Sequence, residues 1–331
     1  MTCGTLPPMK SFWQDLPRPL YVLAPMADVT DPAYRRLIAE YQRPDVTWTE
    51  FVSADGLFYI RERKGVPDAE NPLMRDLEFT PGEHPIVAQL FGSNPETMEY
   101  AARLCASKGF DGIDINMGCP DRSIEKQGCG AAMMKSPETA AAIVTAARAS
   151  GLPVSVKTRI GYNREEIDTW IRAILTVQPE VLTVHLRTRK EMSKVAAHWE
   201  LMPRIVALRN EIAPTTLIFG NGDVKNLTEA QQRVDETGCD GVMLGRGIFG
   251  NPWVFDRTRT YSDISIREKI MALRTLASYF DELRPRKSFH ILKKHVKAFV
   301  QGFDGAAELR AKLMETNDIA AFHAVLDTAV Y

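Results

Sequence analysis

The stretch Gly112-Ile113-Asp114-Ile115-Asn116-Met117-Gly118-Cys119-Pro120 shows the pattern on which the whole chain is built. An apolar strand stops abruptly at glycine and proline, the residues that end strands and form turns. The turn would hold one amide, Asn116, and one thiol, Cys119, at the carboxyl end of the strand. Such a thiol could donate a proton, attack a carbon, bind a metal or be inert, so its role depends on the other strands.

Seven further β-rich runs are found along the chain, at residues 20–24, 46–52, 85–91, 153–158, 181–186, 216–220 and 241–244. Several are almost uninterrupted apolar runs, as expected of parallel strands buried on both faces. Helical periodicity lies between most of them, at residues 95–108, 137–150, 165–177 and 226–237. Eight strands alternating with helices predict an α/β fold, a (β/α)8 TIM barrel over roughly residues 18–255.

Two regions depart from this alternation. Residues 53–84 are dominated by Gly, Pro and charges, which predicts an elaborated loop after the second strand. From about Ser262 strands vanish and amphipathic helices run to the end of the chain. We therefore expect a barrel catalytic domain at residues 1–260 and a smaller all-helical domain at residues 261–331.

The composition of the 331 residues, 45% hydrophobic and 25% charged, is ordinary for a globular protein. No stretch has the length and apolarity of a membrane span and no signal-peptide pattern is visible, so we expect a cytoplasmic protein without a membrane partner. Five cysteines do not suggest a disulfide framework. Cys119 and Cys129 lack two further zinc ligands at plausible spacing, so no metal is expected. The net charge of −1 gives no global sign of a nucleic-acid binder, and a monomer is the default expectation.

In such a barrel the carboxyl ends of the strands form one mouth, where the chemistry takes place. The strand ends are Ala24-Pro25-Met26, Glu50, Gln89, Asn116 with Cys119, Lys157 with Arg159, His185 with Arg187, Asn221-Gly222-Asp223 and Gly245-Arg246-Gly247. So many polar groups at one mouth are costly unless something polar binds there. The glycine-rich turns after the last two strands match the barrel phosphate site, and Arg246 adds a cationic fork suited to phosphate.

The same mouth suits a flavin. Lys157 and His185 would stabilise an anionic reduced flavin ring, and Gln89 could bond its other polar edge. The turn at residues 24–26 could offer backbone groups and a packing surface. Taken singly, each feature has a plainer explanation, and Lys157 could also form a Schiff base as in barrel aldolases. Joint placement at eight consecutive strand ends favours a site for flavin mononucleotide (FMN).

A basic segment lies in the helical region. Residues 284–297 carry six cations and two histidines but no acid; the cations are Arg284, Arg286, Lys287, Lys293, Lys294 and Lys297. Helical spacing gathers Phe289, Leu292, Val296, Phe299 and Phe303 into one apolar stripe, which would leave Lys293, Lys294 and Lys297 on an exposed flank. Uncompensated cations in a near-neutral protein predict a surface that binds RNA phosphates.

These motifs resemble those of the tRNA-dihydrouridine synthase family, along nearly the whole chain. The resemblance rests on the segments 24–31, 49–52, 89–92, 114–120, 156–161, 185–188, 221–224 and 245–247, of which Asn116-Met117-Gly118-Cys119-Pro120 is the most specific. It implies an FMN-dependent barrel enzyme with a C-terminal helical tRNA-binding domain. Such enzymes use NADPH to reduce particular uridines in tRNA to 5,6-dihydrouridine.

The resemblance also implies roles for single residues. A hydride would pass from flavin N5 to uracil C6, and Cys119 would protonate C5 while Asn116 contacts the uracil. The flavin contacts would be Ala24, Pro25, Met26, Gln89, Lys157 and His185 at the ring, and Asn221, Gly222, Asp223, Gly245 and Arg246 at the ribityl-phosphate end. Arg159 and Arg187 would face RNA phosphate or the flipped base. Leu186 departs from the family, which commonly has a small residue there, and a larger side chain could narrow the pocket.

Two other functions fit parts of the sequence. A flavin barrel acting on a small molecule, of the dihydroorotate or enoate reductase type, would explain the mouth but leaves the basic helical region without a role. An RNA-binding or chaperone-like protein that has lost catalysis would show a broken flavin set or a replaced cysteine. Neither change is present in the sequence.

Overall fold

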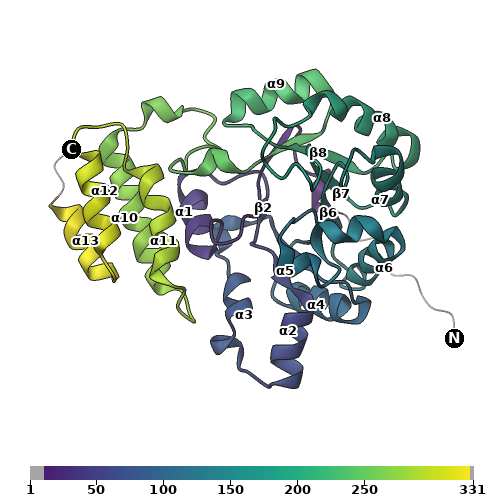
Figure 1. The fold of residues 1–331 in the computed structure, drawn as a ribbon, viewed down its shortest axis with the longest axis horizontal. Helices are drawn as coiled ribbons and strands as arrows, with labels where there is room; N and C mark the ends of the chain where they lie inside the picture. Colours follow the sequence, from purple (N-terminus) through teal and green to yellow (C-terminus); the bar gives the residue numbers. More distant parts are fainter. Residues whose placement is uncertain (1–10, 329–331) are drawn as a thin grey trace.

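The computed structural model describes residues 11–328 and shows a nearly closed barrel of parallel strands with a helical region beside it (Figure 1). The strands are β1 (Leu20–Leu23), β2 (Thr47–Trp48), β3 (Val52–Ser53), β4 (Ile86–Phe91), β5 (Gly112–Met117), β6 (Val154–Arg159), β7 (Val181–His185), β8 (Leu217–Asn221) and β9 (Gly241–Leu244). Their order is β1-β9-β8-β7-β6-β5-β4-β2. A bridge between Val22 and Val46 brings the first strand next to the second. The predicted (β/α)8 barrel is confirmed.

The second predicted strand is interrupted. It forms two short pieces, β2 and β3, because a side chain replaces the backbone ladder between them. The hydroxyl of Thr49 accepts a hydrogen bond from the Gln89 N–H (3.0 Å) and donates one to the Glu50 carbonyl (2.7 Å). The other predicted strands are present, and none of their ends shifts by more than one residue.

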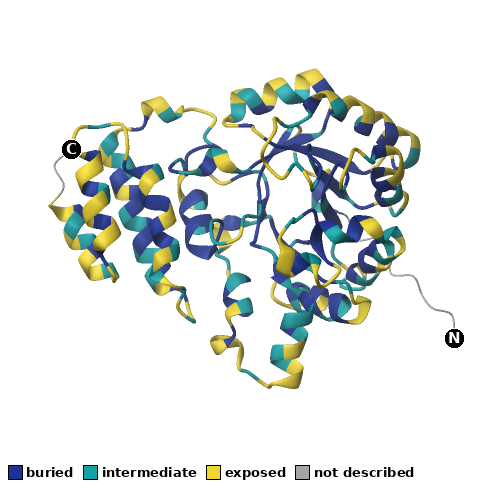
Figure 2. Cartoon of the chain, viewed as in Figure 1, coloured by how far each residue is buried: buried dark blue, intermediate teal, exposed yellow. Residues whose placement is uncertain are grey.

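The strands alternate between two buried layers. One set of side chains faces the surrounding helices and belongs to the larger core. The other set faces the barrel interior, where Trp48 and Phe219 meet Trp13 of the N-terminal turn Phe12–Gln14. The ring of Trp13 lies 5.7 Å from Trp48 and 5.9 Å from Phe219, centroid to centroid, and closes the amino end of the barrel. Figure 2 shows the strands buried almost throughout.

The surrounding helices are α1 (Pro32–Gln42), α4 (Pro95–Ser107), α5 (Arg122–Glu125), α6 (Pro137–Arg148), α7 (Arg172–Thr176), α8 (Met202–Ile212) and α9 (Leu227–Thr237). The side chains of Asp31, Asn94 and Asn226 cap α1, α4 and α9 by accepting backbone N–H bonds. These caps fix where the chain turns from the barrel mouth into each helix.

An insertion follows the second strand, as the sequence predicts. It contains α2 (Ala54–Phe58), a π-helical turn (Tyr59–Arg63) and α3 (Pro72–Asp76). In Figure 1 this segment projects away from the barrel at the bottom of the view.

Four helices form the C-terminal region: α10 (Ile266–Glu282), α11 (Phe289–Phe299), α12 (Ala306–Glu315) and α13 (Ile319–Asp327). Their helical character is as predicted; the domain boundary at residues 260/261 stays a prediction. The region packs on α1, where the ring of Tyr34 lies 4.6 Å from that of His295 and 6.3 Å from that of Phe299. Arg36 of α1 lies 3.6 Å above the ring of Tyr279. One continuous buried cluster therefore joins the barrel to the helical region.

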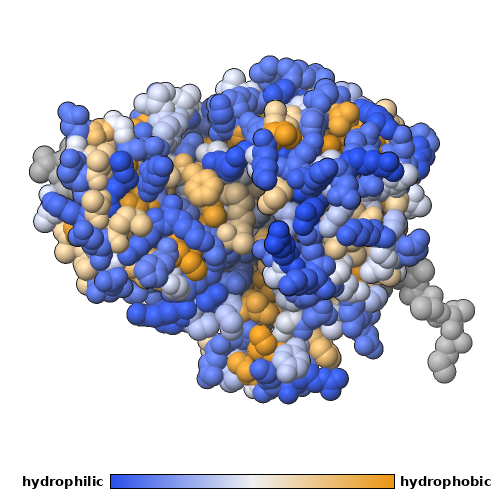
Figure 3. Space-filling model, in the orientation of Figure 1, coloured by the Kyte–Doolittle hydropathy of each residue, from blue (hydrophilic) through white to orange (hydrophobic). Residues whose placement is uncertain are grey.

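The surface view adds a feature of this junction. In Figure 3 a band of hydrophobic side chains runs down the middle of the molecule, between largely hydrophilic surfaces on either side.

No helix within residues 11–328 combines the length and apolarity that a membrane span needs.

Candidate active site

A cavity of about 660 Å³ opens at the carboxyl ends of the strands. Strand register sets its polar groups side by side, with Asn116 opposite Lys157 and His185 opposite both Arg159 and Asn221. Every barrel residue predicted to contact flavin or substrate or to act in catalysis lines this cavity: Ala24, Pro25, Met26, Gln89, Asn116, Cys119, Lys157, Arg159, His185, Arg187, Asn221, Gly222, Asp223, Gly245 and Arg246. The interior side of the strands is thus apolar at the amino end and polar at the mouth.

The turn that carries Cys119 is fixed by hydrogen bonds to its backbone. The Asn116 side-chain oxygen accepts the N–H groups of Gly118 (3.1 Å) and Cys119 (3.0 Å). Behind the turn, Ala131 N–H donates to the Cys119 carbonyl (2.9 Å), and a Cβ on Gly130 would lie 2.7 Å from that oxygen. Burial raises the pKa of Cys119 above its ordinary value, so the thiol keeps its proton at neutral pH.

A chain of amides and a carboxylate lies beneath the thiol. Asn116 donates to Gln89 Oε1 (3.0 Å), and Gln89 donates through Nε2 to Asp114 (2.6 Å). Ser155 also donates to Asp114 (2.6 Å), which lies fully buried inside the barrel. Burial raises the pKa of Asp114 to about 6. Because the Asp114 carboxylate accepts from Gln89 Nε2, it fixes the orientation of the Gln89 side-chain amide. Gln89 Oε1 then fixes the orientation of the Asn116 amide.

Lys157 and His185 lie at the centre of the mouth. The Lys157 amine donates to Asn221 Oδ1 (3.3 Å), and burial lowers the pKa of Lys157 to about 8. Arg187 Nη1 lies 2.9 Å from His185 Nε2. A guanidinium can only donate, so this nitrogen accepts and the neutral ring carries its proton on Nδ1. Burial, and then the neighbouring cations, hold the pKa of His185 well below its ordinary range.

Asp223 gathers the cations at the rim. Its carboxylate pairs with Arg187 and, at 2.5 Å, with Arg246. Burial would raise the pKa of Asp223, but the bonds from Arg187 and from the Ala197 N–H outweigh it and lower that pKa. Arg246 itself is exposed and keeps a free edge toward solvent.

Arg159 and Arg187 were expected to face RNA phosphate or the flipped base, and in the structure several of their N–H groups bond other groups of the protein. Arg159 donates to the carbonyls of Gly118 (2.8 Å), Thr188 (3.2 Å) and Met192 (2.9 Å). Arg187 donates to the Val195 carbonyl (2.7 Å) and is almost fully buried. Both line the cavity and also brace the loop after β7, and that they face RNA phosphate or the flipped base stays a prediction.

Two further expectations are corrected. Glu50 does not line the cavity; its neighbour Phe51 does, and the Glu50 carboxylate turns toward the helical region. Leu186 is fully buried in the core outside the strands and does not line the cavity. It therefore does not narrow the pocket.

The basic segment is less exposed than its sequence suggested. Lys293 is only 7% exposed and donates to the Met314 carbonyl (2.8 Å), so its predicted place on an exposed flank is wrong. Lys294 is exposed but pairs with Asp28 (3.0 Å). Lys297 is exposed, and no ion-pair partner is found for it among residues 11–328. Lys287 is buried among three carboxylates. Three of the six cations in this segment, Arg286, Lys287 and Lys294, therefore have a carboxylate partner.

Sequence reasoning gave no role in the site to several lining residues, among them Phe51, Ser193, Lys225 and Met243. Phe51 follows the interrupted second strand, and Ser193 lies on the long loop after β7. Lys225 stands two residues beyond Asp223, so a reading of the turn after β8 that continued past Asp223 could have found it.

The other thiols lie elsewhere. Cys105, Cys129 and Cys239 are buried and do not line the cavity, while Cys3 lies outside the described residues. Within the described part of the chain, no group of three or more His, Cys, Asp or Glu side chains has the arrangement of a metal site.

A parallel barrel whose strand ends converge on one polar cavity defines the class of TIM-barrel enzymes. The complex of 2-naphthoyl-CoA reductase shares the fold, with a TM-score of 0.53, 9% identity and coverage of 72% of this chain and 49% of that one. The amine oxidase for 6-hydroxypseudooxynicotine from Pseudomonas geniculata has a TM-score of 0.50, 11% identity and coverage of 93% and 63%.

The chain belongs to the dihydrouridine synthase family, an oxidoreductase family, because the family model "Dihydrouridine synthase (Dus)" matches residues 22–331. A "Probable tRNA-dihydrouridine synthase" from Staphylococcus aureus is 42% identical over 324 residues, covering 96% of this chain and 95% of the relative. One from Staphylococcus epidermidis is 41% identical over 322 residues, covering 96% of each. A "Probable tRNA-dihydrouridine synthase 2" from Bacillus subtilis is 41% identical over 321 residues, again covering 96% of each.

Proposed function

We propose that the chain reduces uridines in tRNA to 5,6-dihydrouridine, with FMN bound in the cavity and NADPH as the reductant. The observation that carries this proposal is that one cavity is lined both by Cys119 and by every barrel residue predicted to contact flavin or substrate. It is supported by relatives whose printed names are those of probable tRNA-dihydrouridine synthases. A tRNA substrate agrees with the expected cytoplasmic location.

The residues present fit a flavin phosphate. The charged residues that line the cavity are Lys157, Arg159, Arg187, Asp223, Lys225 and Arg246, all cations but one. The turns at the phosphate end also need bare backbone: a Cβ on Gly247 would lie 2.6 Å from the Lys225 carbonyl, and Gly222 has φ +133. Cationic side chains and glycine turns of this kind suit an anionic group. FMN, when bound there, supplies hydride to the uracil ring.

The chain's own residues supply the proton and hold the base. Cys119 holds a proton on Sγ, since burial raises the pKa of its thiol, and from the cavity wall it would deliver that proton to a ring carbon. The Asn116 amide has one N–H beyond the bond to Gln89 and can donate it to a uracil carbonyl. The amine of Lys157 and the Nδ1–H of His185 stabilise negative charge at the centre of the mouth. A stacked base cannot reach this cavity, so the uridine must be flipped out of the RNA.

The test uses purified protein and tRNA from a strain that lacks the gene. We expect a yellow protein whose FMN is reduced by NADPH and reoxidised by that tRNA, with dihydrouridine detected by mass spectrometry of the nucleosides. The deletion strain should lack dihydrouridine at particular tRNA positions. A strain that keeps every dihydrouridine would refute the proposal. Reoxidation by a small enone or orotate in place of tRNA would favour the small-molecule alternative.

Base reduction should slow as pH rises through about 8. The pKa of Lys157 is lowered to about 8, so its cationic form is present below that pH and is lost above it. Cys119 loses its proton only at higher pH, since its pKa is raised. We expect the rate of flavin reoxidation by tRNA, measured in single turnovers, to fall above about pH 8. In Lys157→Met the rate should be low and should not fall further above about pH 8. The same fall in rate in this variant would contradict the assignment of the pH dependence to Lys157.

Reversing the exposed cations of α11 should weaken tRNA binding. Lys294→Glu with Lys297→Glu places two acids where phosphate contacts are proposed, so the affinity should fall and the salt dependence should become shallower. FMN content should not change, because neither residue lines the cavity. The control is Lys312→Glu, which reverses an exposed cation on α12. Equal affinity of the double variant and the control across salt concentrations would refute this surface.

A further inference from the structure

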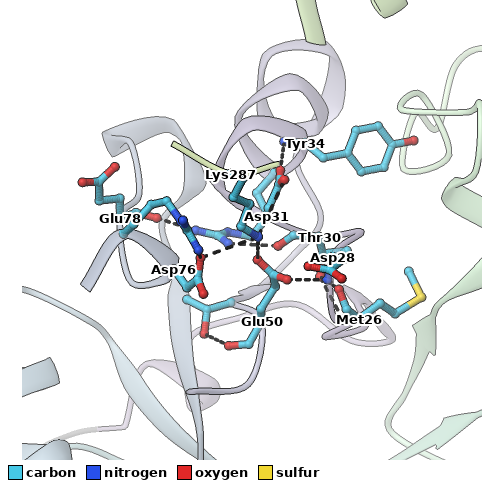
Figure 4. A network of polar contacts seen from close by, with 12 residues as sticks. Met26, Asp28, Thr30, Asp31, Tyr34, Glu50, Asp76, Glu78 and Lys287 are labelled. Carbon is cyan, nitrogen blue, oxygen red and sulfur yellow. Dashed lines mark hydrogen bonds and ion pairs between the residues drawn. The ribbon is translucent and has the colours of Figure 1, made fainter. Parts of the chain in front are cut away.

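The strongest unassigned feature outside the cavity is a buried ionic cluster at the junction with the helical region. Lys287 lies between α10 and α11, and its side chain is only 4% exposed. Its amine lies 2.7 Å from Glu50, 3.6 Å from Asp76 and 3.9 Å from Asp31. Figure 4 shows the lysine amine among these three carboxylates.

The carboxylates come from three separate parts of the barrel. Asp31 caps α1, Glu50 lies between β2 and β3, and Asp76 ends α3. Asp76 is also bonded by Arg75, which in turn donates to the Pro285 carbonyl (3.0 Å) two residues before Lys287. Burial alone would lower the pKa of Lys287, but the surrounding carboxylates raise it, so the amine stays charged. One segment of the helical region is thus fixed to three barrel segments at once.

The other end of the same cluster reaches the cavity. Glu50 Oε1 accepts the backbone N–H of Asp28 (2.5 Å). Asp28 has φ +54, a left-handed conformation that non-glycine residues rarely adopt, and Glu50 holds its amide there. The turn is closed by Thr30, which accepts the Met26 N–H (2.9 Å), and Met26 lines the cavity. The Glu50 carboxylate therefore contacts both Lys287 of the helical region and the turn that carries Met26 of the cavity wall.

We propose that Lys287 and Glu50 form a positioning pair that sets the helical region against the Met26–Thr30 turn and so aligns bound tRNA with the cavity. The inference rests on the proposed function. Neither residue lines the cavity, and both act through others: Lys287 through the start of α11, and Glu50 through the Asp28 amide. A helical region that binds tRNA must hold a fixed position relative to the cavity, since a displacement of the reacting groups by about 1 Å can lower the rate about 100-fold.

The test separates the two half-reactions. In Lys287→Met we expect NADPH to reduce the bound FMN within about 2-fold of the wild-type rate, because Lys287 does not line the cavity. Reoxidation by tRNA at saturating tRNA should fall about 10- to 100-fold. Lys287→Arg should recover part of the loss, because it restores a cation among the carboxylates. The control, Lys312→Met, removes an exposed lysine of α12 and should match wild type in both steps.

Glu50→Gln provides the second test and keeps the experiment decisive if Lys287→Met does not fold. Its amide oxygen still accepts the Asp28 N–H, but the charge facing Lys287 is lost. The same selective loss of tRNA-dependent reoxidation is expected, and the double variant should lose less than the product of the single losses. Folded variants that keep wild-type rates in both steps, or lose both steps equally, would overturn the inference. A wild-type enzyme that tRNA does not reoxidise would instead refute the proposed function, before any variant is compared.

Discussion

Cys119→Ala should lower the rate of base reduction by about 10²- to 10⁴-fold, the usual contribution of a positioned general acid. The cavity should otherwise be intact, because Asn116 holds the turn through backbone N–H groups that alanine retains. FMN content and FMN reduction by NADPH should be those of the wild type. The measurement is the single-turnover rate at which tRNA reoxidises the reduced variant.

Two further cysteine variants give this experiment its controls. Cys129→Ala removes a buried thiol that does not line the cavity, and it should reduce tRNA normally. Cys119→Ser keeps a hydroxyl that is a much weaker acid, so its rate should be low. If Cys119→Ala turned over tRNA as fast as Cys129→Ala, Cys119 would not be the proton donor.

Arg35→Met should destabilise the fold by about 3–5 kcal/mol, the cost of leaving one partner of a buried ion pair uncompensated. The Arg35 and Glu83 side chains are both fully buried, with 2.9 Å between Nε and Oε2. Arg35 also donates to the Thr30 carbonyl (2.9 Å), which belongs to the turn beside the cavity. Urea denaturation should show a lower midpoint with an unchanged slope.

The neighbouring arginine is a matched control. Arg36 stands on the same helix but is partly exposed, and it pairs with Glu282 (2.8 Å) in solvent. Surface pairs of this kind contribute about 0–1 kcal/mol. Arg36→Met should therefore cost much less than Arg35→Met. Equal losses for the two variants would mean that burial of the Arg35 pair contributes no extra stability.

The placement of the barrel residues could be predicted because it depends on local rules. A strand alternates its side chains, and parallel strands end at one edge, so the register of Asn116, Lys157 and His185 follows from where each strand stops. The chemical roles of these residues stay predictions. The interruption at Glu50 was not predictable, because the hydroxyl of Thr49 bonds a backbone group of another strand.

Exposure in the helical region could not be predicted for a different reason. The periodicity of α11 identified Leu292, Val296 and Phe299 as buried, but not how wide the covered face is. Lys293 is enclosed because the end of α12 supplies the Met314 carbonyl. Lys287 is enclosed by carboxylates more than two hundred residues away in sequence. Likewise, two of the three carbonyls that Arg159 bonds, those of Thr188 and Met192, lie on a loop whose path no sequence pattern specifies.

The packing of the helical region on α1 limits how the enzyme can be rebuilt. The Tyr34 ring packs against that of His295, and the Tyr279 hydroxyl bonds Glu40 (2.6 Å). Lys287 bonds Glu50. In each contact one residue belongs to the barrel and the other to the helical region. A chimaera that exchanges only the C-terminal helices between two relatives would set foreign side chains against this face. Exchanging the helical region therefore requires the residues of α1 that face it and the carboxylates around Lys287 to be exchanged with the helices.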